Sequence, residues 1–125
     1  MKVRGLDHVV LRVADVERSL AWYCDELGCM PERVDEWRAG TIFFPSVRLD
    51  ATTVIDLLQA PRADGNVDHV CLVIEPEDLQ ALKDSGRFDV VDGPATRWGA
   101  QGDGTSLYVR DPDGNVVELR YYGDA

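Results

Sequence analysis

The chain has 125 residues, enough for one compact domain, and its 45% hydrophobic and 29% charged residues are typical of a globular protein. Thirteen Lys and Arg against 23 Asp and Glu give a net charge of −10, which disfavours nucleic acid as a partner. The first residues lack the apolar stretch of a signal peptide, and no run approaches the roughly 18 apolar residues of a membrane span.

The cysteines favour a reducing compartment. Cys24, Cys29 and Cys71 are odd in number and have no CxxC spacing, so a disulfide framework is disfavoured. We expect a cytoplasmic protein that does not contact membranes.

The first half begins with a strand and a helix. Residues 6–13 are rich in β-branched side chains and predict a strand. A helix is predicted over residues 15–27, because Asp15 suits its start and Gly28 its end.

Three further strands are expected before the midpoint, and they would pair antiparallel. They fall at residues 29–34, 41–44 and 52–58. Residues 61–66, Pro-Arg-Ala-Asp-Gly-Asn, are rich in turn formers and predict a linker between two halves.

The second half repeats this order. A strand at residues 67–74 precedes a helix at 75–83, with Pro76 near its start and Gly86 at its end. The later segments are expected to be a strand at 88–91, a glycine-rich loop at 97–106, a strand at 105–110, a turn at 111–114 in which Asp113 and Gly114 are structural, and a strand at 115–122.

Direct sequence similarity links the halves. Residues 6–11, Leu-Asp-His-Val-Val-Leu, match residues 67–72, Val-Asp-His-Val-Cys-Leu. Residues 53–57, Thr-Val-Ile-Asp-Leu, match residues 115–119, Asn-Val-Val-Glu-Leu. We therefore predict an α+β fold of two tandem βαβββ units forming a curved, cleft-bearing mixed sheet. Its single domain spans residues 1–125, with repeat units of about 1–60 and 67–125.

The repeat superimposes four residues able to bind a metal. His8 matches His69, and Asp56 matches Glu118. Strand alternation places these side chains on one face, where a pseudo-twofold axis would bring them together. One histidine on a half-buried strand is usually structural, but two matched histidines with two matched carboxylates favour a divalent metal. Asp56, the shorter carboxylate, could instead bind through water.

The tandem units and the ligand order His8, Asp56, His69, Glu118 resemble the vicinal oxygen chelate superfamily. That family includes glyoxalase I, fosfomycin-resistance enzymes, methylmalonyl-CoA epimerase, extradiol dioxygenases and metal-free bleomycin-binding proteins. The resemblance implies those four residues as ligands of one divalent ion, Ni, Co, Mn, Fe or Zn, and a homodimer.

Several residues are candidate contacts of a small-molecule substrate. Residues 102–108 resemble a segment of some fosfomycin-resistance enzymes, which would make Ser106 and Tyr108 substrate contacts. The glycines could also expose backbone N–H groups to an anion, or the segment could be a plain flexible loop. Val10 stands where those enzymes typically have Thr, which argues against fosfomycin but leaves an anionic substrate open.

Three more residues on the ligand-bearing face have two interpretations each. Arg12 and Arg120 could bind an anionic substrate or balance the acidic ligands. Cys71 could be a soft fifth ligand or a small buried thiol.

The favoured function is a glyoxalase-like isomerase or lyase in which Glu118 or Asp56 moves a proton. A metal-free protein that sequesters a small molecule or antibiotic is the alternative, and an antibiotic-modifying transferase or hydrolase stays open. An Fe-dependent extradiol dioxygenase is less favoured, because both histidines are already used as ligands.

Overall fold

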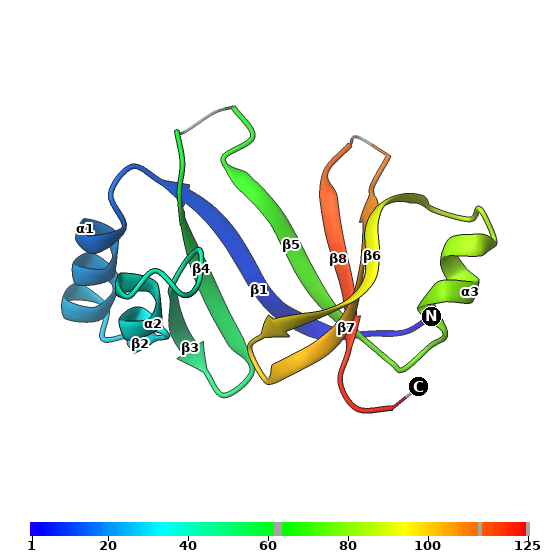
Figure 1. Cartoon of the computed structure of the whole chain (residues 1–125), viewed down its shortest axis with the longest axis horizontal. Helices are drawn as coiled ribbons and strands as arrows, with labels where there is room; N and C mark the ends of the chain where they lie inside the picture. The colour runs from blue at the N-terminus through cyan, green and yellow to red at the C-terminus, as the bar shows by residue number, and fades with distance from the viewer. Residues whose placement is uncertain (62–63, 113, 125) are drawn as a thin grey trace.

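The computed structural model describes residues 1–61, 64–112 and 114–124, which form one mixed eight-stranded sheet with short helices at both ends (Figure 1). The strands are β1 (Val3–Val13), β2 (Met30–Glu32), β3 (Ser46–Asp50), β4 (Thr53–Gln59), β5 (Val67–Ile74), β6 (Asp89–Gly99), β7 (Gly102–Arg110) and β8 (Val116–Tyr121). The helices are α1 (Val16–Ala21), the π-helix η1 (Trp22–Glu26), α2 (Val34–Arg38) and α3 (Leu79–Asp84).

The sheet is built from two equivalent halves. Counted outward from the centre, the strands run β1, β4, β3, β2 in the first half and β5, β8, β7, β6 in the second. β1 and β5 pair antiparallel at the centre, whereas β1–β4 and β5–β8 are parallel. This topology confirms the duplicated βαβββ unit, and it places the strands of the predicted ligands next to one another.

The first helix follows its sequence signals. The Asp15 side chain accepts a hydrogen bond from a backbone N–H of the first turn, which caps α1. Val16 and Leu20 are buried and pack with Leu57 of β4, so α1 covers an apolar face of the sheet. The last turns are wound as η1, and Gly28 follows with a φ of 73°.

The helix of the second half is shorter than predicted. A helix was expected over residues 75–83, but α3 starts only at Leu79. The Asp78 side chain accepts a hydrogen bond from a backbone N–H at 3.0 Å and so sets the start of the helix. Leu79 and Leu82 pack against the second half of the sheet. No helix in the described ranges is long and apolar enough to cross a membrane.

The predicted strand at residues 41–44 is wrong. These residues form bends, and the edge strand β3 begins two residues later, after Pro45. Proline has no N–H to donate to a sheet and restricts the residue before it, which explains why pairing starts only beyond it. The preceding residues form the unpredicted helix α2, and Phe43 is 92% exposed.

The predicted glycine-rich loop at residues 97–106 is also wrong. β6 and β7 continue through it as a hairpin in which Arg97 pairs with Gly104 and Gly99 with Gly102. Gly102 has a φ of 94°, which suits the tight turn. The backbone groups that were expected to hold an anion therefore belong to a paired ladder.

The turn before β8 matches its prediction where it is described. The Asp111 carboxylate accepts a hydrogen bond from the Asn115 N–H at 2.8 Å, and Gly114 has a φ of 86°. Asp113, in the same turn, lies outside the described residues, as do residues 62 and 63 of the predicted linker.

Candidate metal centre

The four predicted ligands lie on the four central strands of one chain. His8 is on β1 and Asp56 on β4, while His69 is on β5 and Glu118 on β8. His8 and Glu118 both pair with the same residue of β5. Asp56 and His69 both pair with the same residue of β1. Directly paired residues point to the same face of a sheet, so the fold brings all four side chains together.

Three donor atoms form a compact group. The Nε2 atoms of His8 and His69 are 3.4 Å apart. Oε1 of Glu118 lies 3.2 Å from Nε2 of His8 and 3.1 Å from Nε2 of His69. Asp56 stands slightly farther out, with Oδ2 at 3.7 Å from Nε2 of His8.

This donor set fits a divalent transition metal. Adjacent ligands bound at about 2.0–2.1 Å in octahedral or tetrahedral geometry lie roughly 2.8–3.4 Å from one another. The separations among His8, His69 and Glu118 fall in that range. Asp56 is not a member of this tight set, so a fourth-ligand role and a water-bridged role both fit its position.

Each histidine is oriented by the aspartate that precedes it. Nδ1 of His8 donates to Asp7 at 2.7 Å, and Nδ1 of His69 donates to Asp68 at 2.8 Å. These bonds hold a hydrogen on Nδ1 of each ring, so that in the neutral imidazole, the form that binds a metal, the Nε2 lone pair faces the cluster. Sequence reasoning missed these aspartates, although the duplicated Asp-His pair was a visible signal.

The two carboxylates are also held from behind. Ser46 donates to Oδ1 of Asp56, and Ser106 donates to Oε2 of Glu118 at 2.7 Å. Nη2 of Arg120 reaches the same Glu118 oxygen at 2.8 Å. Ser106 and Arg120, the expected substrate contacts, are both 0% exposed, and in this structure they contact Glu118 instead of the cleft.

The titrating groups respond to one another. Burial lowers the pKa of both histidines, but hydrogen bonds with neighbouring carboxylates raise the pKa of His8 and His69 above the ordinary value. Burial raises the pKa of Glu118, yet hydrogen bonds from both imidazoles bring it well below its usual range. Burial dominates at Asp56 and raises its pKa. The cluster thus needs positive charge at its centre, as protons or as a cation.

Two other candidates lie beside this cluster. Burial raises the pKa of Cys71 to about 11, and its sulfur groups with Asp7 and His8 instead of with the set of His8, His69 and Glu118, which favours a buried thiol over a fifth ligand of that set. Arg12 donates to Asp68 at 3.3 Å and lines a different hollow from the one above the ligands. Arg12 therefore supports the carboxylate that orients His69.

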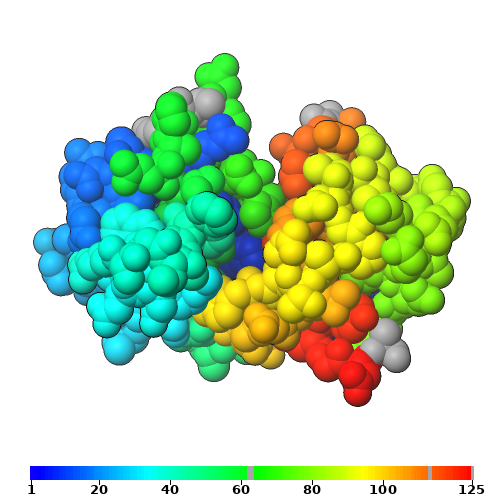
Figure 2. All heavy atoms as spheres, in the orientation of Figure 1, coloured from blue at the N-terminus to red at the C-terminus, as the bar shows by residue number. Residues whose placement is uncertain are grey.

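The ligands form the floor of a cleft of about 530 Å³ between the halves. Figure 2 shows this face hollowed between the cyan-green segment before β3 and the yellow strand β6, with blue β1 at the bottom. Tyr108 lines the cleft, and its ring meets that of His69 edge-on at 5.5 Å. The other walls are formed by Arg33, Thr41, Ile42, Phe43, Phe44, Arg97 and Trp98.

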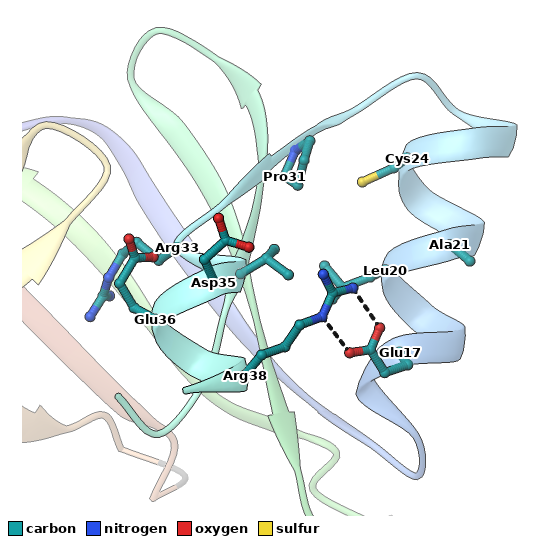
Figure 3. Close-up of a pocket in the computed structure, with 10 residues that line it drawn as sticks. Glu17, Leu20, Ala21, Cys24, Pro31, Arg33, Asp35, Glu36 and Arg38 are labelled. Carbon is teal, nitrogen blue, oxygen red and sulfur yellow. Dashed lines mark hydrogen bonds and ion pairs between the residues drawn. The ribbon is translucent and has the colours of Figure 1, made fainter. Parts of the chain in front are cut away.

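A second hollow, of about 470 Å³, lies between α1 and α2 (Figure 3). Arg38 spans it and binds Glu17 through two hydrogen bonds of 2.8 Å. Both side chains are more than half exposed, so this pair attaches α2 to α1 only weakly. The metal-binding groups found among the described residues lie elsewhere.

The fold and the site define a class: a duplicated βαβββ domain whose central strands present histidines and carboxylates to a cleft. A model of the Glyoxalase/Bleomycin resistance protein/Dioxygenase superfamily matches residues 5–119. The chain belongs to this superfamily.

Relatives agree with that assignment. The chain is 33% identical to the glyoxalase domain-containing protein RDO1 of Mycosarcoma maydis, covering 100% of this chain and 72% of the relative. It is 32% identical to a probable lactoylglutathione lyase of Synechocystis, covering 90% of this chain and 91% of that protein. The Mn(II)-bound glyoxalase from Novosphingobium aromaticivorans shares the fold, with a TM-score of 0.70 and 23% sequence identity. The match covers 93% of this chain and 37% of the glyoxalase chain.

Proposed function

We propose that the protein is a metal-dependent enzyme of the glyoxalase type, an isomerase or lyase whose substrate binds through two neighbouring oxygens. The convergence of two imidazole Nε2 atoms and Oε1 of Glu118 within 3.1–3.4 Å carries this proposal. Ni, Co, Mn, Fe and Zn all suit a mixed nitrogen and carboxylate set. The names of a cyanobacterial lactoylglutathione lyase and a Mn(II)-bound glyoxalase support the same reading.

The protein's own groups divide the work. When bound, the metal would polarise the substrate oxygens and stabilise the negative charge that develops on them. Asp56 is the better placed of the two carboxylates to move a proton, since Ser46 holds Oδ1 while Oδ2 stands at the edge of the donor set. Glu118 has both oxygens engaged by neighbouring side chains and suits a ligand role.

Tyr108 completes the proposed machinery. Burial, with the nearby charge of Glu118, raises the pKa of Tyr108, so its hydroxyl stays protonated at neutral pH. A protonated phenol in the cleft can donate a hydrogen bond to a substrate oxygen. Extradiol cleavage is the weaker proposal, because the chain's two histidines both belong to the ligand set.

We also propose a homodimer, as the family resemblance implies. All four ligands come from one chain, so a second copy is not required to complete the site. Light scattering of the purified protein tests this assembly.

The catalytic proposal is tested with chelator-stripped protein reloaded with each of the five metals. We expect at least one to be held at one ion per chain and to support isomerisation of the hemithioacetal of methylglyoxal and glutathione. Asp56→Asn should keep the fold and lose turnover. Tight binding of a small molecule without turnover, unaffected by His8→Ala, would support the sequestering alternative instead.

A further inference from the structure

Two arginines, one from each half of the chain, line the cleft. Arg33 comes from the turn before α2 in the first half, and Arg97 comes from β6 in the second half. Neither belongs to the repeated ligand set. Both line the cavity whose floor holds Asp56 and Glu118, so an acidic floor faces a basic rim.

Arg33 is held for this position. Its φ of 60° lies in the left-handed region, which residues with a side chain rarely adopt. Its guanidinium lies over the Trp98 ring, 4.2 Å from the centroid, so the stack crosses from one half to the other. In Figure 3, the Arg33 side chain points away from Glu17 and Arg38, although Arg33 also lines the hollow between α1 and α2.

The guanidinium of Arg33 keeps its donors available. Stacking uses the flat face of the group and leaves the N–H groups at its edge for an anion. Within residues 1–61, 64–112 and 114–124, the stack on Trp98 is the interaction recorded for this side chain. Glu36 lies nearby in Figure 3, but no ion pair joins it to Arg33 among those residues.

Arg97 is held by two exposed contacts. Its Nη1 donates to the Thr96 carbonyl at 3.0 Å, and its Nη2 lies 3.3 Å from Asp92, with the Arg97 and Asp92 side chains 42% and 62% exposed. An ion pair this exposed contributes little and can be exchanged for another anion.

Apolar residues line the same cavity. Ile42, Phe43 and Phe44 come from the first half of the chain, and Trp98 comes from the second. Phe43 is 92% exposed, so a ligand with an apolar body would bury a large aromatic surface that now faces water.

We propose that Arg33 and Arg97 bind an oxyanion of the substrate remote from its metal-binding oxygens. The substrate class is a small molecule with two vicinal oxygens at one end, an apolar body, and a carboxylate or phosphate at the other. This inference rests on the proposed metal function, because the vicinal oxygens need the metal on the floor.

The test uses three matched catechols and zinc-loaded protein without oxygen. The probes are 3-(3,4-dihydroxyphenyl)propionate, 2-(3,4-dihydroxyphenyl)ethylphosphonate and the neutral 3-(3,4-dihydroxyphenyl)propionamide. Each probe is titrated into the protein by calorimetry. Wild type should bind the carboxylate or the phosphonate about tenfold or more tightly than the amide, since hydrogen bonds between charged groups are the stronger ones. The preferred anion distinguishes a carboxylate substrate from a phosphate one.

Variants locate the effect. Arg33→Gln and Arg97→Gln should each reduce the preference for the anionic probe severalfold. Arg110→Gln is the matched control, because Arg110, like Arg97, forms an exposed ion pair with an aspartate of β6 but does not line the cleft. Its preference should equal that of the wild type.

Zinc content is measured on every sample. Equal binding of anionic and neutral probes by the zinc-loaded protein, or no binding of any probe, would overturn the arginine pair while leaving the metal site intact. Protein that retains neither zinc nor any of the other four metals would overturn the metal function itself, and this inference with it.

Discussion

At the scale of single residues, the site depends on ligand side chains that neighbouring residues hold in place through hydrogen bonds. Asp7 and Asp68 fix the imidazoles, and Ser46 fixes the inner oxygen of Asp56. A ligand positioned in this way loses less freedom when it binds a metal.

Ser46→Ala tests this support. The change leaves Oδ1 of buried Asp56 without its donor, which should lower the free energy of unfolding by about 1–3 kcal/mol. It should also weaken metal binding about 10-fold to 100-fold. Urea unfolding and calorimetric metal titration measure the two effects. Ser19→Ala in α1 is the control and should change stability by less than about 0.5 kcal/mol. An unchanged metal affinity in Ser46→Ala would place Asp56 outside the coordination sphere.

At the scale of elements, the β6–β7 hairpin is a structural wall. Gly99, in this hairpin, lies against the guanidinium of Arg120 and the carboxylate of Asp7. A methyl group there would collide with both, and Arg120 cannot move aside because its donors bind Glu118 and several backbone carbonyls. The absence of a side chain at Gly99 therefore allows the second half to support the ligands.

Gly99→Ala should destabilise the protein by about 1–3 kcal/mol, as overpacking of a filled core does. It should also weaken metal binding, because Arg120 and Asp7 are displaced. Thermal unfolding with and without metal measures both. Gly5→Ala is the control, since its added methyl group meets no atom within 4 Å. Equal behaviour of the two variants would show that the hairpin does not support the site.

Helix α1 lies apart from the chemistry, on the apolar face of the sheet. Asp15→Ala removes its cap and should lower the free energy of unfolding by about 1 kcal/mol. Metal affinity should stay that of the wild type. Asp25→Ala is the control: Asp25 is not the N-cap residue of α1 or η1, so its loss should leave the free energy of unfolding nearly unchanged. A large loss of metal affinity in Asp15→Ala would contradict this separation of stability from function.

At the scale of the whole molecule, internal duplication decides what the sequence alone can predict. His8 with His69 and Asp56 with Glu118 repeat in matched strands, so the unit, the sheet and the candidate ligands were all predictable from the pattern. The cleft rim is not repeated. The stack of Arg33 on Trp98 joins the two halves and leaves no periodic signal, whereas the unpaired segment at 41–45 follows from Pro45, a local signal that the apolar pattern of residues 41–44 obscured.

The same duplication gives the molecule its working shape. Antiparallel pairing of β1 with β5 puts one half on each side of a common floor, so metal ligands gather at the centre and the walls above them can diverge. A repeated core with unrepeated walls suits a family that performs many reactions on one fold.

The central claim is that His8, His69 and Glu118, with Asp56 beside them, bind one divalent metal, and elemental analysis of purified protein tests it most directly. Wild type, stripped and reloaded, should retain close to one ion per chain. His69→Gln and Glu118→Gln, which preserve side-chain size, should retain far less, while Asp15→Ala should match the wild type. Absence of retained metal in the wild type, or equal retention in all four proteins, would contradict the account.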